Sequence, residues 1–135
     1  MSAVSYELDG RVGILTLNRP DSLNAVNPDM VAGLLAASAL AADDPVARAV
    51  VVRGAGKSFM AGGDLRWFRE QLALPVAQRQ SGFAELIAGV HAAIANFKRM
   101  DKPVIAAVQG AVAGFGLSLM LARSEERRVG KECLR

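Results

Sequence analysis

The sequence predicts an α/β fold in which an N-terminal hairpin leads into parallel strands joined by crossover helices. Two short strand-forming runs lie on either side of an Asp-Gly turn near the start of the chain. Two continuous apolar runs of the buried-strand kind follow at residues 49–52 and 104–108, and a helical pattern lies between them. Since a crossover between parallel strands is right-handed in nearly all proteins, this order predicts a right-handed βαβ unit.

The hairpin is marked by its turn. Residues 6–8 and 12–17 are rich in strand-forming side chains, and Asp9-Gly10 between them is a dipeptide favoured in tight hairpin turns. We therefore expect an antiparallel pair at the start of the chain.

The first helix is marked by its cap. Asn27, Pro28 and Asp29 supply a capping side chain, a preset φ and an acid near the positive end of the helix dipole. These residues predict a helix from Met30 to about Ala42, closed by the Asp-Asp-Pro sequence at 43–45.

A second helix is expected between the two buried strands. Apolar side chains recur there every three or four residues, at Phe83, Leu86, Ile87, Val90, Ile94 and Phe97. Residues 71–80, with Pro75 among them, indicate a break between two helical pieces.

Composition favours a folded cytoplasmic protein. Apolar residues make up 52% of the chain and charged residues 21%, which is ordinary for a soluble domain. No apolar run approaches the roughly 18 residues of a membrane span, and the N-terminus lacks signal-peptide features. The single Cys133 and single His91 are too few for the usual zinc sites, so we expect no structural metal.

The basic excess lies at the C-terminal end of the chain. The formal net charge is +3, and residues 123–135 carry five Lys or Arg against three Glu, which leaves the preceding part almost neutral. A nucleic-acid-binding protein gathers basic side chains into a patch, often with aromatic residues for stacking. Neither pattern is present, so we expect no nucleic-acid partner.

Each buried strand is followed by a glycine turn that opens a helix. The turns are AGGDL at residues 61–65 and AGFGL at residues 113–117. Glycine permits positive φ and close approach of a ligand, and a helix start leaves N–H groups without intrahelical partners. If neighbouring parallel strands carry both turns, their N–H groups converge at the carboxyl ends of the sheet. The pair predicts an oxyanion hole.

Three segments then make the chain resemble the enoyl-CoA hydratase/isomerase, or crotonase, superfamily. They are LNRPDSLNAV at 17–26, KSFMAGGDL at 57–65 and DKPVIAAVQGAVAGFGLSL at 101–119, and their order and spacing fit as well. The resemblance implies a crotonase-like (ClpP/crotonase) fold and an enzyme that stabilises a thioester enolate of an acyl-CoA substrate. It implies no cofactor other than the coenzyme A of the substrate, and a homotrimer or dimer of trimers for the full-length protein.

By position, the resemblance assigns the two oxyanion donors to the backbone N–H groups of Ala61 and Phe115. Main-chain donors are fixed by the fold, and one such donor is worth about a hundred- to a thousandfold in rate. Substrate contacts are implied at Ser22, Leu23, Phe59, Gly62, Gly63, Asp64, Leu65 and Gly114.

One position departs from the hydratase pattern. Hydratase-type members carry a catalytic glutamate one helical turn after the second glycine motif, and the matching residue here is Ser118. Their second acid–base glutamate lies further along the family pattern. Isomerases, dehalogenases, hydrolases and ring-forming synthases of the superfamily place their acid or base elsewhere, so the reaction type stays open.

The last stretch, RSEERRVGKECLR, interrupts the resemblance. The family pattern continues here through a further strand and several helices, whereas this segment has little apolar content. We therefore expect residues 1–122 to be the N-terminal part of a crotonase-like domain, truncated there, and residues 123–135 to be a non-native or chimeric tail.

Several of these residues also have structural interpretations. Asp64 is expected to act mainly as a helix cap, Trp67 and Phe68 as core, and Lys57 and Arg66 as solvated cations. The segment GAGKSF does not form a nucleotide-binding P-loop, because Val51 stands where that motif requires glycine.

Two other classes of protein remain as alternatives. One is a non-catalytic fragment with weak or no CoA binding, and the other is a related Clp-type serine peptidase. A Ser118–His91 nucleophile pair is disfavoured because Met120 replaces the last glycine of a G-x-S-x-G elbow. His91 lies mid-helix among apolar neighbours, and we expect a structural role for it.

Overall fold

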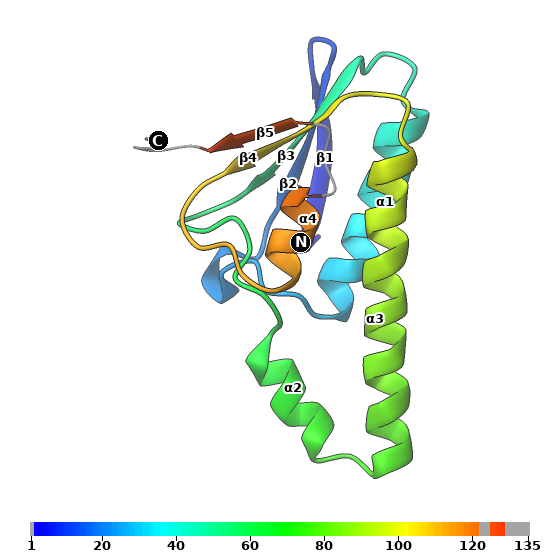
Figure 1. The fold of residues 1–135 in the computed structure, drawn as a ribbon, viewed down its shortest axis with the longest axis vertical. Coiled ribbons are helices and arrows are strands. Elements are labelled where there is room, and N and C mark those ends of the chain that lie inside the picture. Colours follow the sequence, from blue (N-terminus) through cyan, green and yellow to red (C-terminus); the bar gives the residue numbers. More distant parts are fainter. Residues whose placement is uncertain (1, 122–124, 129–135) are drawn as a thin grey trace.

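A five-stranded mixed sheet organises residues 2–121 and 125–128, which this computed structural model describes (Figure 1). The strands follow chain order across the sheet. β1 pairs antiparallel with β2, and all the later neighbours are parallel. The bounds are β1 Val4–Asp9, β2 Val12–Leu17, β3 Ala49–Gly54, β4 Val104–Val108 and β5 Glu125–Arg128. The predicted α/β fold, with a hairpin leading into parallel strands, is confirmed.

Burial alternates along the strands because successive side chains point to opposite faces of a sheet. On one face, Leu15, Leu17 and Val50 are completely buried, and Val104 and Val108 are almost so. These side chains share one core cluster with the inward face of the first long helix. The core therefore lies between the sheet and its covering helices.

The first long helix, α1 (Pro28–Asp43), begins where the cap predicts. The Met30 N–H donates to Asn27 Oδ1 at 2.9 Å. Helix α1 lies alongside α3 (Val76–Arg99), and both run beside the sheet (Figure 1). A partly buried hydrogen bond joins the two helices, because Asn96 Nδ2 donates to Ser38 Oγ at 2.9 Å.

The break before α3 is shorter than predicted. Three residues, 73–75, separate helix α2 (Leu65–Leu72) from α3. Pro75 is the N-cap residue of α3. Proline is tolerated at a helix start because its missing N–H needs no partner there. Helix formers follow it directly, so the chain returns to helix at once.

Three aromatic rings connect α2 to α3. Trp67, Phe68 and Phe83 meet edge to face, with ring centroids 5.2–5.8 Å apart. All three side chains are half-buried. Trp67 and Phe68 also pack against the main core cluster, so these contacts fix α2, which projects beyond the strands in Figure 1.

Strand β5 falls within the stretch that the sequence analysis assigns to a tail. It pairs in parallel with β4, with Ile105 opposite Glu125. Residues 122–124 and 129–135, including Cys133, lie outside the described ranges. The boundary after residue 122 stays a prediction.

Two further findings concern the described residues only. None of their helices is long and apolar enough to cross a membrane. Their His, Cys, Asp and Glu side chains also form no group of three or more that would hold a metal ion.

Candidate functional site

The two glycine turns lie side by side beyond the carboxyl ends of β3 and β4. The Phe59 N–H donates to Gln109 O at 2.8 Å, the Met60 N–H to Ala111 O at 3.3 Å, and the Ala113 N–H to Met60 O at 3.1 Å. These bonds continue the parallel pairing of the two strands into the loops. The position of one turn therefore fixes the position of the other.

Glycine is required where the turns touch. Gly62 and Gly114 have φ values of +94° and +54°, and a Cβ on Gly114 would lie 3.4 Å from Gly62 Cα. A Cβ on Gly116 would overlap the Met60 carbonyl oxygen. Side chains at these positions would strain the backbone or force the two turns apart.

A third segment, residues 23–26, runs beside the first turn. The Ala61 N–H donates to Leu23 O at 3.0 Å, the Val26 N–H to Gly62 O at 2.7 Å and the Asp64 N–H to Val26 O at 2.9 Å. The first turn is thus held on one side by this segment and on the other by the second turn.

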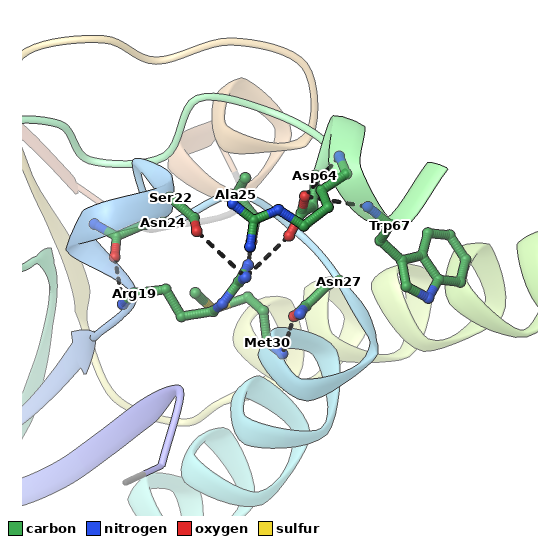
Figure 2. A network of polar contacts seen from close by, with 9 residues as sticks. Arg19, Ser22, Asn24, Ala25, Asn27, Met30, Asp64 and Trp67 are labelled. Carbon is green, nitrogen blue, oxygen red and sulfur yellow. Dashed lines mark hydrogen bonds and ion pairs between the residues drawn. The ribbon is translucent and has the colours of Figure 1, made fainter. Parts of the chain in front are cut away.

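Arg19 and Asp64 connect the same segments through their side chains (Figure 2). An Arg19 guanidinium nitrogen lies 2.9 Å from Asp64 Oδ2, and the other terminal nitrogen donates to Ala25 O at 2.6 Å. Asp64 Oδ1 accepts hydrogen bonds from the N–H groups of Arg66 and Trp67, which confirms Asp64 as the cap of α2. Burial raises the pKa of Asp64, but these hydrogen bonds and the Arg19 charge outweigh it and the pKa is lowered.

Asn24 holds the 19–26 loop against the sheet from within. Its side chain is fully buried, and Nδ2 donates to Ala55 O and Ser58 O at 2.9 Å each. Its Oδ1 accepts from the Arg19 N–H at 2.8 Å. Arg19 and Asn24 were not among the residues singled out from the sequence. Both lie in LNRPDSLNAV, one of the three segments that carry the family resemblance, and this was the signal that could have found them.

Among the residues that line one cavity of the site, two have a backbone N–H without a partner in the described part of the chain. Neither the Gly63 N–H nor the Phe115 N–H forms a hydrogen bond with any described residue. Both residues line one cavity of about 320 Å³, called here the Phe115 cavity. Its lining consists of Val26, Gly63, Phe68, Leu86, Ile87, Val90, His91, Phe115 and Ser118.

A second cavity, of about 330 Å³, shares Gly63 with the first. This Ser22 cavity is lined by Asp21, Ser22, Leu23, Ala25, Ala61, Gly63, Asp64, Leu65 and Arg66. A larger hollow of about 540 Å³ between the chain start and α1 includes neither glycine turn. The candidate site is therefore the pair of cavities that meet at Gly63.

The chain is similar in sequence and in structure to known proteins of one family. A sequence model described as enoyl-CoA hydratase/isomerase matches residues 12–130. The chain belongs to the enoyl-CoA hydratase/isomerase family. It is 39% identical over 121 residues to YhaR of Bacillus subtilis, described as an enoyl-CoA hydratase/isomerase, and this match covers 90% of the chain and 45% of that protein.

Other members of the enoyl-CoA hydratase/isomerase family match in the same way. A crotonyl-CoA hydratase of Syntrophomonas wolfei is 33% identical over 119 residues, which are 87% of this chain and 43% of the relative. The crystal structure of an enoyl-CoA hydratase/isomerase from Mycobacterium paratuberculosis superimposes with a TM-score of 0.81 at 38% identity, covering 95% of this chain and 49% of that one. The chain thus spans less than half the length of the curated relatives it matches.

Most of the substrate contacts implied by the family resemblance lie together. Ser22, Leu23, Gly63, Asp64 and Leu65 all line the Ser22 cavity. Gly62 and Gly114 form the contact between the two turns.

Phe59 lies apart from these residues. Its side chain is completely buried in the core, and its N–H donates to Gln109 O. It lines neither cavity, so the structure gives it a packing role.

The expectation of an open donor at Ala61 is wrong. Its N–H is already engaged by Leu23 O, and the residue lines the Ser22 cavity rather than the Phe115 cavity. In the bridge between Val26 and Gly63, the Gly62 carbonyl and the Asp64 N–H face the 23–26 segment. The Gly63 N–H is left out of this pairing, since a bridged residue in a parallel pair directs its own peptide groups to the opposite side.

Ser118, the residue at the position of the hydratase glutamate, lines the Phe115 cavity. His91 is exposed and lines the cavity, whereas its apolar neighbours in the sequence favoured a structural role. Ile87, Val90 and His91 share one face of the helix. This spacing was the signal in the sequence that could have placed His91 in the cavity wall.

The two cations considered from the sequence differ in position. Arg66 lines the Ser22 cavity, whereas Lys57 is exposed and lines neither cavity. Of the two aromatic residues of α2, Phe68 lines the Phe115 cavity.

Proposed function

We propose that this chain forms the thioester-binding part of an enzyme that stabilises an enolate of an acyl-CoA substrate. One observation carries the proposal: two unpartnered backbone donors, at Gly63 and Phe115, line a single cavity. Backbone N–H groups that have no protein partner are free to donate to a ligand oxygen, and main-chain donors of this kind stabilise developing negative charge in oxyanion holes.

The two donors replace the Ala61–Phe115 pair that the sequence suggested. A thioester carbonyl oxygen accepts both hydrogen bonds and gains negative charge when the neighbouring carbon loses a proton. Because the donors are main-chain groups held by the fold, they need no reorientation as the charge develops. Each contributes about a hundred- to a thousandfold in rate.

Each cavity binds a different part of the substrate, and the two cavities meet at Gly63. The Ser22 cavity offers backbone groups and the Arg66 cation to the coenzyme A moiety. The Phe115 cavity offers an apolar wall from Phe68, Leu86, Ile87 and Val90 to the acyl group. The thioester is then placed at the shared residue.

The reaction is one of proton transfer next to the thioester. A relative is named crotonyl-CoA hydratase, but Ser118 stands here in place of the glutamate that the hydratase pattern requires. We therefore favour enolate formation, with or without double-bond migration, over hydration by a glutamate pair. A trimeric assembly and a cytoplasmic location, both expected from the sequence, stay predictions.

The test measures polarisation of a bound thioester. Butyryl-CoA labelled with ¹³C at the carbonyl is bound to the chain, and its C=O stretch is followed by infrared difference spectroscopy. The proposal predicts saturable binding and a stretch shifted to lower wavenumber, because the two donors weaken the C=O bond. Replacing the Phe115 N–H by an ester oxygen, with phenyllactic acid at that position, reduces the shift.

Phe115→Ala and an ester at Leu117 serve as controls, and Phe115→Pro is a second test of the donor. Phe115→Ala keeps the N–H and retains the shift, whereas Phe115→Pro removes the N–H and loses it. An ester at Leu117 removes a hydrogen bond to Gly114 O inside the turn but no proposed donor. A carbonyl stretch that is unchanged by the Phe115 ester contradicts the proposed oxyanion hole.

A further inference from the structure

The Phe115 cavity is lined by one imidazole side chain, that of His91. Val26, Phe68, Leu86, Ile87 and Val90 supply hydrocarbon to its wall, and Gly63 and Phe115 supply backbone N–H groups. The Ser118 hydroxyl donates and accepts hydrogen bonds. Among the residues that line the cavity, only His91 carries a group suited to general acid–base catalysis.

Helix α3 brings His91 to this place. Ile87, Val90 and His91 are spaced three and four residues apart, so they share one face of the helix, and all three line the cavity. His91 therefore belongs to the same wall as the apolar side chains proposed to contact the acyl group.

The imidazole of His91 is uncommitted. It forms no hydrogen bond or ion pair with the described residues, and its side chain is exposed. A histidine with a structural role is normally held by a hydrogen-bond partner when it is buried. Both of its nitrogens are thus available to take up or release a proton in the cavity.

We infer that His91 is the catalytic acid–base residue of this site, an inference that rests on the function proposed above. An imidazole nitrogen removes the proton from the carbon next to the thioester carbonyl. The electron pair of that C–H bond forms the enolate, whose oxygen is held by the N–H groups of Gly63 and Phe115. Return of the proton from the imidazolium to the same carbon regenerates the thioester.

The same groups account for migration of a double bond. In a substrate with a double bond between the β and γ carbons, the electron pair spreads over both the oxygen and the chain. The imidazolium then delivers its proton to the γ carbon, and the double bond moves next to the carbonyl. One proton leaves and one returns, so no further reactant is needed. Catalysis from α3 also explains how the site works with Ser118 in the glutamate position.

The experiment follows exchange of the α-protons of butyryl-CoA in D₂O by NMR. The unaltered chain is expected to bind the thioester and to exchange these protons. His91→Gln is expected to slow the exchange by about a hundred- to ten-thousandfold while the Kd changes less than threefold. His91→Ala is expected to recover exchange when free imidazole is added. Lys98→Gln, an exposed change on the same helix outside the cavity, is the matched control and keeps the exchange rate.

The outcomes separate the inference from the function on which it rests. If the chain binds and exchanges butyryl-CoA and His91→Gln exchanges it equally fast, His91 is not the base, although the proposed function stands. If the chain binds the thioester without exchange, the role of His91 is also overturned. If it neither binds nor polarises the thioester, both proposals fail. Labelling of Ser118 by a fluorophosphonate that depends on His91 would indicate a nucleophile–base pair and overturn the inference as well.

Discussion

Arg19 and Asp64 are 45 residues apart in the sequence, yet their side chains form an ion pair of 2.9 Å beside the first glycine turn. The exposed fractions of the two side chains are only 21% and 12%. Asp64 in turn caps α2, and Arg19 also binds the Ala25 carbonyl (Figure 2). The pair thus fixes the loop that lines the Ser22 cavity to the turn that carries the Gly63 N–H.

Removal of Arg19 is expected to destabilise the fold. Arg19→Ala leaves the Asp64 carboxylate and the Ala25 carbonyl without their charged partner, and we expect a loss of about 2 kcal/mol in the free energy of unfolding. Urea denaturation measures this change. Arg53→Ala breaks an exposed ion pair of 3.7 Å to Glu7 and is expected to cost less than about 0.5 kcal/mol. Equal losses in the two variants would show that the Arg19 pair has no special structural role.

Acid is expected to weaken the fold partly through Asp64. Its pKa in the folded chain lies below the usual value for aspartate, so its contribution to stability is present above that usual pKa and is lost as the pH falls through the folded pKa. In a series of urea titrations below pH 4, Asp64→Asn should therefore lose stability less steeply than the unaltered chain. Asparagine is also a good N-cap, so α2 should keep its start.

A second carboxylate acts in the same pH range and serves as a comparison. The pKa of Asp44 is lowered, chiefly by a hydrogen bond of 2.7 Å from the Tyr6 hydroxyl. Asp44→Asn should also flatten the acid dependence, but it lies far from the glycine turns and should leave butyryl-CoA binding unchanged. If neither variant changes the slope below pH 4, the two lowered pKa values do not contribute to acid stability.

Substitution of Asn24 is expected to be severe. Asn24→Ala leaves the Ala55 and Ser58 carbonyls and the Arg19 N–H without the partner they have in the interior, and we expect a cost of about 3 kcal/mol. Asn24 also has a φ of +55°, a conformation that alanine adopts less readily. Asn24→Asp keeps the shape but loses both donors, so it should be at least as unstable. Thermal unfolding that matches the unaltered chain for either variant would contradict this assignment.

Adding one methyl group at Gly116 is expected to separate the two turns. The new Cβ meets the Met60 carbonyl oxygen, which is backbone and has little room to move, so we expect a loss of about 1–3 kcal/mol. Helix propensity alone favours alanine over glycine by about 1 kcal/mol, so a net loss isolates the clash. Gly10→Asn is the control, because nothing lies within 4 Å of a Cβ there and asparagine tolerates the positive φ. Butyryl-CoA binding should weaken in the first variant only.

The elements of the fold were predictable because local signals agree with the tertiary structure. The Asp-Gly turn, the Asn27 cap and the apolar runs at β3 and β4 each mark an element that the structure contains. The pairing of the two glycine turns was predictable for the same reason, since parallel neighbouring strands end at the same edge of the sheet.

The choice of backbone donor was not predictable from the same signals. It depends on which way each peptide group faces, and Gly62, with a φ of +94°, lies between Ala61 and Gly63. Nothing in the residue types at 61 and 63 shows which N–H is taken by the 23–26 segment. The exposure of His91 was not predictable either. Apolar neighbours in the sequence are equally compatible with a cavity wall and with a core.

The Phe115 cavity is lined by Gly63 and Phe115, whose N–H groups are the proposed donors, and by apolar side chains. Under the proposed function, substitutions at Phe68, Leu86, Ile87 or Val90 would alter the room available to an acyl chain without removing either proposed donor. Selection, natural or in the laboratory, would then be able to change which thioesters fit while the proposed oxyanion hole is inherited intact.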